Sequence, residues 1–126
     1  MLTSGAHTLP KEERLSGKTA VSSLISSGRW GMQGPVKFCY VRHAEGGLNR
    51  IMVSVPKKHF KRAVKRNLLK RRLREAYRLQ KGLLTAGGID LMLFYNSQEI
   101  ASTEELAGTV ALILKEIDKR TACVDN

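Results

Sequence analysis

The chain has 126 residues, 42% of them hydrophobic, which is enough apolar material for one globular domain with its own core. Its two cysteines, Cys39 and Cys123, stand far apart and without a cluster of histidines, which argues against a disulfide scaffold or a metal site and suits a reducing cytoplasm. No apolar run is long enough to predict a signal peptide or a membrane span.

The net charge of +11 is concentrated in one segment. Residues 57–81 contain 12 lysines and arginines and one acidic residue, Glu75, whereas the rest of the chain contains ten residues of each sign. A localised field of this kind attracts polyanions. The segment therefore predicts a nucleic acid or an anionic membrane as the partner.

The first half of the chain begins with a polar stretch, 1–16, which predicts a tail ahead of a single domain over 17–122. Apolar residues at helical spacing predict a helix over 18–27. The stretch 28–35, with its glycines and proline, predicts the end of this helix and a connection.

Two strands are predicted next. Residues 36–43 alternate between the two faces of a strand, and residues 50–55 form a second apolar run that stops at Pro56, because proline cannot donate to a strand ladder. Gly46-Gly47 between the two runs predicts a hairpin turn.

The second half alternates helices and a strand. The basic segment predicts a helix over 60–80, the apolar run 89–95 predicts a buried strand, and Ser102 followed by Glu105 forms a capping box that starts a last helix. This order predicts an α+β fold with helices packed on a small sheet.

The basic helix has two distinct faces on a helical wheel. One face is apolar and predicts the side that packs on the sheet; it consists of Leu69, Leu73, Ala76 and Tyr77. The other face presents cations and one amide at helical spacing; it consists of Asn67, Lys70, Arg71, Arg74 and Arg78. Like charges four residues apart destabilise a helix, so this face predicts a partner that neutralises them.

RNA is the partner that this helix favours. A membrane-binding helix would insert the apolar face that the core here requires. DNA-binding proteins of this size usually offer a helix-turn-helix or a pairing interface, and neither is evident. Arginine on the cationic face favours bidentate contact with phosphate.

The basic segment resembles the protein component of bacterial ribonuclease P. Val53–Lys58 resembles the family's Ser-Val-x-Lys-Lys strand end, and the helix that follows matches the family motif in register at Ala63, Val64, Arg66, Asn67, Lys70, Arg71, Arg74, Glu75, Ala76 and Tyr77. Leu68 stands where the family has arginine, and Lys65 or Arg72 could substitute for it.

The resemblance implies a mixed sheet of about four strands with three helices and a left-handed crossover through the basic helix. It also implies a protein cofactor, bound to the catalytic RNA of ribonuclease P and to precursor tRNA, in which the RNA holds the magnesium ions and hydrolyses the phosphodiester that releases the 5′ leader. No membrane or DNA partner is expected.

The resemblance also assigns residues to two surfaces. The expected contacts with RNA are Lys57, Lys58, Arg62, Lys65, Arg66, Asn67, Lys70, Arg71, Arg74 and Arg78. The expected cleft for the single-stranded leader, between the sheet and the first helix, is lined by Val21, Ile25, Phe38 and Tyr40.

Two rival functions stay open at this point, a structural RNA-binding protein of the ribosomal kind and a protein-only nuclease. A nuclease needs clustered carboxylates or a histidine pair, whereas Glu12-Glu13 and Glu104-Glu105 are explained as helix starts or surface residues. We expect His59 to be a surface residue and Trp30 to pack in or beside the core.

Overall fold

In a computed structural model of the protein, the residues described are 15, 18–42, 48–85 and 87–124. They form the following elements in chain order: α2 (Lys18–Ser27), β1 (Arg29–Gln33), β2 (Val36–Arg42), β3 (Arg50–Ser54), α3 (Ala63–Gln80), the 3-10 turn η2 (Lys81–Leu83), β4 (Ile89–Tyr95) and α4 (Thr103–Val124). The expected first helix, basic helix and last helix are all present, as are the three expected strands.

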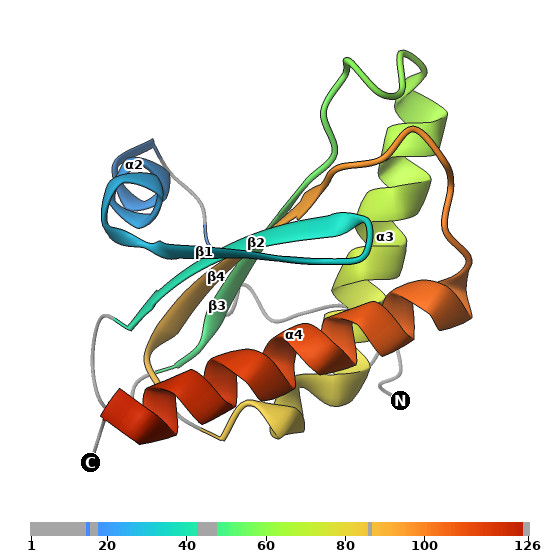
Figure 1. Cartoon of the computed structure of the whole chain (residues 1–126). Coiled ribbons are helices and arrows are strands. Elements are labelled where there is room, and N and C mark those ends of the chain that lie inside the picture. Colours follow the sequence, from blue (N-terminus) through green and yellow to red (C-terminus); the bar gives the residue numbers. More distant parts are fainter. Residues whose placement is uncertain (1–14, 16–17, 43–47, 86, 125–126) are drawn as a thin grey trace, which may run out of the picture.

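The four strands form one mixed sheet in the order β1-β2-β4-β3, in which only β3 and β4 run parallel. Helices α3 and α4 lie on one face of this sheet and α2 lies on the other (Figure 1). The predicted α+β class, with three helices on a sheet of about four strands, is therefore confirmed.

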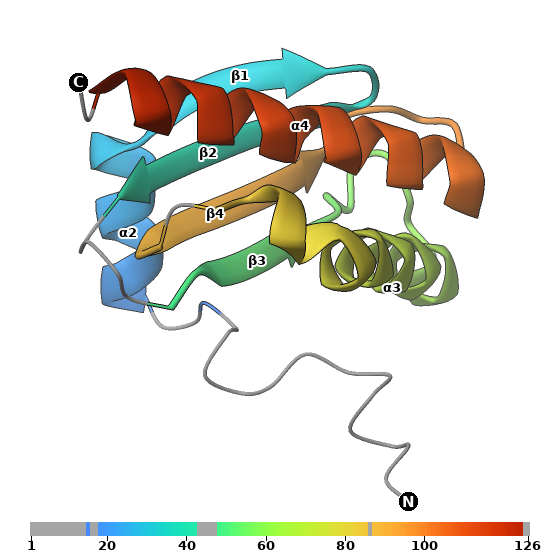
Figure 2. The same ribbon diagram turned by 90° about the horizontal axis from the view of Figure 1, so that it is seen from below.

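The crossover from β3 through α3 to β4 is left-handed. Seen with α3 and α4 in front of the sheet, β3 and β4 run to the right and β4 lies above β3 (Figure 2). Parallel strands are joined by a right-handed crossover in nearly all proteins, so this connection is exceptional. It agrees with the expectation from the family resemblance.

The main core lies between the sheet and the pair α3 and α4. Helix α3 buries the four residues predicted for its packing face, Leu69, Leu73, Ala76 and Tyr77. Helix α4 adds its own apolar stripe, Leu106, Val110, Ile113, Leu114 and Ile117, each with no exposed surface. The helical periodicity of the sequence therefore located both packing faces correctly.

A second, smaller core lies under α2, on the opposite face of the sheet. It is formed by Leu15, Leu24, Cys39 and Met92. Leu15, which the sequence assigned to the tail, packs here, and its backbone N–H donates to the Ile51 carbonyl at 2.8 Å. Burial raises the pKa of the Cys39 thiol, which donates to the Leu24 carbonyl at 3.4 Å.

Strand β1 occupies residues that the sequence predicted to be a connection. Its central residue, Gly31, pairs with Phe38, and a Cβ atom on Gly31 would lie 2.4 Å from the Cζ atom of that ring. Glycine is therefore required for the close approach of the ring. Only Gly34, with φ of +55°, and Pro35 form the turn into β2.

The predicted hairpin between residues 36–43 and 50–55 is wrong. β4 lies between β2 and β3 and pairs with both, antiparallel to the first and parallel to the second. Gly46-Gly47 lies outside the described residues. The hairpin signal misled because two sequential strands separated by glycines need not be neighbours in a sheet that receives a later strand between them.

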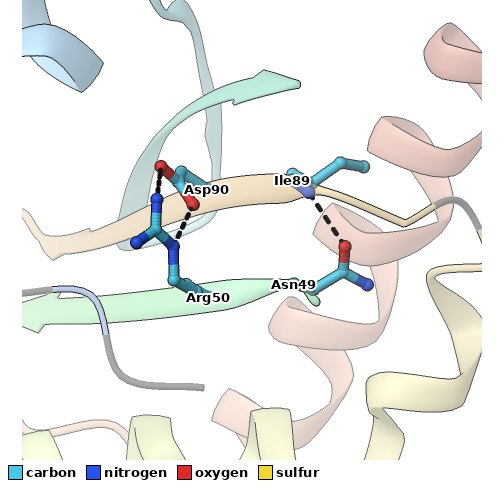
Figure 3. Close-up of polar contacts among 4 residues, drawn as sticks. All are labelled: Asn49, Arg50, Ile89 and Asp90. Carbon is cyan, nitrogen blue, oxygen red and sulfur yellow. Dashed lines mark hydrogen bonds and ion pairs between the residues drawn. The ribbon is translucent and has the colours of Figure 1, made fainter. Parts of the chain in front are cut away.

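An ion pair holds β3 and β4 together where both strands begin (Figure 3). The Arg50 guanidinium donates to both carboxylate oxygens of Asp90, from Nε and from one terminal nitrogen, each at 2.8 Å. Beside it, the backbone N–H of Ile89 donates to Asn49 Oδ1 at 2.9 Å. Because Asp90 is only 5% exposed, this bidentate pair fixes the register of the two parallel strands.

The start of α4 is fixed by side chains. Ser102 Oγ accepts from the backbone N–H of Glu105 at 3.1 Å, which confirms the N-cap half of the predicted capping box. In the connection before it, the buried Tyr95 hydroxyl donates to the Glu99 carbonyl at 2.5 Å and accepts from the Ala101 N–H at 3.0 Å.

Two leucines of α3 provide a matched test of its orientation. Leu73 has no exposed surface, whereas Leu79 is 68% exposed. We expect Leu73→Ala to lower the free energy of unfolding by about 2–5 kcal/mol, because it leaves a cavity in the main core. We expect Leu79→Ala to change the free energy of unfolding by less than about 0.5 kcal/mol. Urea denaturation followed by circular dichroism measures both, and equal effects would contradict the rotation of the helix described above.

Candidate nucleic-acid interface

The outer face of α3 presents the predicted cations. Asn67, Arg71 and Arg74 are exposed, and Lys70 and Arg78 are half-buried. This face lies opposite the buried stripe, so folding leaves it to solvent. A row of cations along one helix is the arrangement that follows the phosphates of a nucleic-acid backbone.

Three of the arginines in the basic segment, Arg66, Arg72 and Arg78, also form hydrogen bonds within the protein. Arg66 donates to the carbonyls of Phe60 and Lys61, both at 2.8 Å, so it closes the loop that precedes α3. Arg72 donates to the Ala101 carbonyl at 2.6 Å, so it ties α3 to the start of α4. The sequence did not anticipate either role, because both depend on carbonyl groups placed by the tertiary fold.

Arg78 forms an ion pair with Glu75, one turn earlier on α3. The hydrogen bond to this carboxylate raises the pKa of Arg78. Glu75, the one acid of the basic segment, therefore offsets charge near the end of α3.

The loop between β3 and α3, residues 55–62, carries most of the remaining predicted contacts, and we call it the basic loop. Lys57, Lys58 and Arg62 are exposed, as is Lys65 in the first turn of α3. Phe60 anchors the loop against Tyr95, with ring centroids 5.9 Å apart. His59, expected on the surface, instead has both ring nitrogens buried, and neither has a hydrogen-bond partner among the described residues.

Part of the sheet face that carries α2 is left uncovered. Strand register puts five residues of all four strands on this part, which we call the open face: Trp30, Met32, Lys37, Ser54 and Phe94. Trp30 is 41% exposed and Met32 is 54% exposed, so Trp30 lies beside the core and not within it. The Lys37 ammonium lies 4.9 Å from the centroid of the Trp30 ring, at cation–π distance.

Phe38 and Tyr40 do not face α2, so their assignment to a cleft between α2 and the sheet is wrong. Both belong to the main core on the other face, with exposed fractions of 2% and 6%. The reason is the alternation of β2, which places Lys37 and Cys39 on the sheet face that carries α2, and Phe38 and Tyr40 on the face that carries α3 and α4. The two expected residues of α2 remain accessible, Val21 half-buried and Ile25 46% exposed.

Sequence reasoning missed the open face because it missed β1. Once residues 29–33 form a strand paired with β2, Trp30 lies opposite Cys39 and Met32 lies opposite Lys37. The open face also leads directly into the basic loop, since β3 ends at Ser54 and Lys57 follows three residues later. Aromatic and cationic side chains therefore continue from the sheet onto α3.

Within the described parts of the chain, no three histidine, cysteine or acidic side chains lie close enough together to hold a metal ion. The same residues include no helix that is both long and apolar enough to cross a membrane. The α3 face and the open face offer cations and aromatic rings, which suit binding to nucleic acid.

A comparison with protein families decides the relationship of this chain. Residues 9–118 match the model of the family described as Ribonuclease P. The chain belongs to the ribonuclease P protein family. The match extends over most of the chain and includes the whole basic segment, residues 57–81.

Curated relatives and solved structures agree with this assignment. The chain is 41% identical over 78 residues to the ribonuclease P protein component of Porphyromonas gingivalis, covering 60% of this chain and 57% of the relative. It is 42% identical over 84 residues to that of Chlorobaculum tepidum, covering 63% of this chain and 54% of the relative. The chain thus spans little more than half the length of these relatives.

Two solved structures share the fold. The ribonuclease P protein of Staphylococcus aureus superimposes with a TM-score of 0.71 at 20% identity, covering 83% of this chain and 94% of that one. The protein from Thermotoga maritima superimposes with a TM-score of 0.72 at 21% identity, covering 82% of this chain and 96% of that one.

The cationic face of α3 can be tested with a charge-matched pair of variants. We expect Arg74→Ala to weaken binding to structured RNA and to reduce the slope of log K against log salt by about 0.7–0.9, the value for one phosphate contact. Lys115→Ala, which removes an exposed cation from α4, should leave the slope unchanged. Fluorescence anisotropy at a series of salt concentrations measures both, and equal slopes for the two variants would remove α3 from the interface.

Proposed function

We propose that this chain is the protein subunit of a ribonuclease P, a ribonucleoprotein that removes the 5′ leader of precursor tRNA. The observation that carries the proposal is the basic helix of a chain that belongs to the ribonuclease P family, with its motif cations on the solvent side. In this proposal the protein is a cofactor, and the RNA subunit hydrolyses the phosphodiester.

The catalytic RNA would bind along α3 and the loop before it. The contacts we propose are the cations and the amide predicted from the sequence: Lys57, Lys58, Arg62, Lys65, Arg66, Asn67, Lys70, Arg71, Arg74 and Arg78. Of these, Arg66 would act partly by holding the loop, because its guanidinium already binds the carbonyls of Phe60 and Lys61. In place of the family arginine at Leu68, exposed Lys65 is a better substitute than Arg72, whose guanidinium binds Ala101.

The single-stranded leader would lie across the open face. Trp30 and Phe94 offer rings on which bases can stack, and Lys37 offers a cation for the backbone between them. Val21 and Ile25 of α2 would border this path. The leader would thus run from the open face toward the basic loop, where the RNA subunit binds.

Magnesium belongs to the RNA in this proposal. Phosphoryl transfer needs a metal ion to stabilise the attacking and leaving oxygens, and RNA phosphates can bind it. The protein's contribution is positive charge that brings two RNA molecules together. We propose the cytoplasm as the place of action, in keeping with the buried, reduced Cys39.

The first test is cleavage of precursor tRNA at low magnesium, with the candidate catalytic RNA and the protein assayed separately and together. We expect release of the 5′ leader only from the mixture. Cleavage by the protein alone would reveal a nuclease, and no effect of the protein would leave a structural RNA-binding protein.

The leader path is tested with Trp30. We expect Trp30→Ala to weaken binding of precursor tRNA by about 5- to 150-fold, since stacking of a base on an aromatic ring is worth about 1–3 kcal/mol. Mature tRNA, which lacks the leader, should bind Trp30→Ala and the unchanged protein equally. The control is Leu112→Ala, because Leu112 is 51% exposed on α4, on the other face of the sheet. Equal losses for both tRNAs would contradict a path across Trp30.

A further inference from the structure

Two loops leave the sheet at the same end, because β3 and β4 are parallel and end side by side. Ser54 pairs with Phe94, so the basic loop and the loop that follows β4, residues 96–102, begin next to each other (Figure 1). We call the second one the β4–α4 loop. The basic loop carries cations of the proposed RNA interface. Tyr95, the last residue of β4, contacts both loops.

The Tyr95 ring supports the basic loop. Tyr95 has no exposed surface, and its ring centroid lies 5.9 Å from that of Phe60, with the two planes inclined at 49°. Phe60 is only 5% exposed, although Lys58 and Arg62, two residues before and after it, are exposed. Phe60 is therefore buried too deeply to stack on RNA, and its packing on Tyr95 fixes the place from which the neighbouring cations extend.

The Tyr95 hydroxyl holds the β4–α4 loop. It donates to the Glu99 carbonyl and accepts from the Ala101 N–H at 3.0 Å. Burial raises the pKa of Tyr95, so the hydroxyl stays protonated and continues to donate. One side chain thus packs its ring on the basic loop and binds the backbone of the β4–α4 loop with its oxygen.

Helix α3 binds the same two loops from its own side. Arg66 donates to the Phe60 carbonyl at 2.8 Å, and Arg72 donates to the Ala101 carbonyl at 2.6 Å. Phe60 and Ala101 are also the residues that Tyr95 contacts. The two arginines are separated by roughly 9 Å along the helix, at 1.5 Å per residue. Two contacts at this separation fix the orientation of α3 relative to both loops.

Tyr95 differs from an ordinary core residue in what its hydroxyl does. The ring belongs to the main core, and a phenylalanine would bury nearly the same apolar surface. A buried hydroxyl is unfavourable unless it is hydrogen-bonded, and here it both donates to and accepts from one loop. The hydroxyl therefore contributes order in the β4–α4 loop, which apolar burial alone does not supply.

This order matters for a partner that binds α3 and the basic loop together. A loop that is ordered before its partner binds loses little conformational entropy on binding. Without the hydroxyl, the Ala101 carbonyl is no longer fixed, and Arg72 loses the partner that holds α3 against the loops. The cations would then be ordered only when RNA binds. Their number in the complex would be the same, so affinity should fall without a change in the counterions released.

We propose that Tyr95 is a positioning residue for RNA binding, which holds the basic loop and the β4–α4 loop against α3 before the RNA arrives. Tyr95 itself touches no RNA, because it has no exposed surface. It acts through Phe60, Arg66 and Arg72. The inference rests on the proposed function for its ligand, the catalytic RNA.

The first experiment measures affinity for the catalytic RNA over a series of salt concentrations. We expect Tyr95→Phe to weaken binding by about 3- to 10-fold, the range that corresponds to one buried hydrogen bond, with an unchanged salt slope. The control is Ile117→Val, a buried change in the same core, fourteen residues after α4 begins, which should leave the affinity unchanged. Equal losses for the two variants would reduce Tyr95 to a general core residue and overturn the proposal.

The second experiment observes the loops in the free protein by ¹⁵N relaxation. Backbone order parameters of residues 97–101 should fall in Tyr95→Phe from about 0.85 toward about 0.6, the values for rigid and flexible backbone. Phe60→Leu should have the same effect on residues 57–62 and should also weaken RNA binding at an unchanged slope. It serves as the test if thermal melting shows that Tyr95→Phe does not fold. Rigid loops in the folded variants would contradict the positioning role.

The outcomes separate this inference from the proposed function. Unchanged affinity in a Tyr95→Phe protein that supports leader removal would reject the positioning role and leave the proposed function intact. Weaker RNA binding at an unchanged slope, in a protein whose unchanged form never supports leader removal, would support the positioning role and reject the proposed function. A reduced slope in Tyr95→Phe would mean that phosphate contacts are lost, which would reject positioning as the cause.

Discussion

Parallel pairing of β3 with β4 is the constraint on which the rest of the structure depends. Two parallel neighbours cannot be joined by a short turn, so the chain between them must cross one face of the sheet. In this protein that crossing is α3, the segment with most of the positive charge. The Arg50–Asp90 pair fixes the register at the start of both strands, and thereby the place from which α3 departs and to which the chain returns.

The crossing helix explains how strong positive charge and a stable core coexist. Leu69, Leu73 and Tyr77 must be buried for the sheet to be covered, so rotation of α3 about its axis is not free. Cations at the remaining positions are then held outward, without a dedicated scaffold. Among the described residues, α2 is the one helix on the opposite face, and this face keeps an area where Trp30 and Lys37 meet solvent. One sheet thus separates a surface suited to phosphates from one suited to bases.

The sequence predicted the elements that depend on local pattern. Helical periodicity gave both packing faces, and the run 89–95 gave β4 with the bounds it has in the structure. What the sequence could not predict depends on pairing between distant segments. The sequence did not predict β1, because a glycine such as Gly31 usually interrupts a strand. Residue 31 is glycine because the Phe38 ring of the neighbouring strand lies against it.

The candidate site shows the same limit. The helical wheel separated the cations of α3 from its packing residues, because helical geometry alone fixes which side chains share a face. It could not predict that Arg66 and Arg72 donate hydrogen bonds to backbone carbonyl groups. Nor could it predict which face of β2 would be covered by α2. The wrong assignment of Phe38 and Tyr40 has this cause, because alternation separates the two faces of a strand but does not show which helix packs on each face.

The two edges of the sheet remain to be considered, because an unpaired strand edge is a template for aggregation. At β3 the backbone of Leu15 satisfies the Ile51 carbonyl, so the chain covers part of its own edge. At β1 the edge is only five residues long and begins with the exposed Arg29. A protein with a net charge of +11 already repels its copies, and these two features oppose edge-to-edge association once bound polyanion has cancelled that repulsion. The two edges therefore oppose the addition of a strand from another copy even when a bound polyanion has neutralised the charge of the protein.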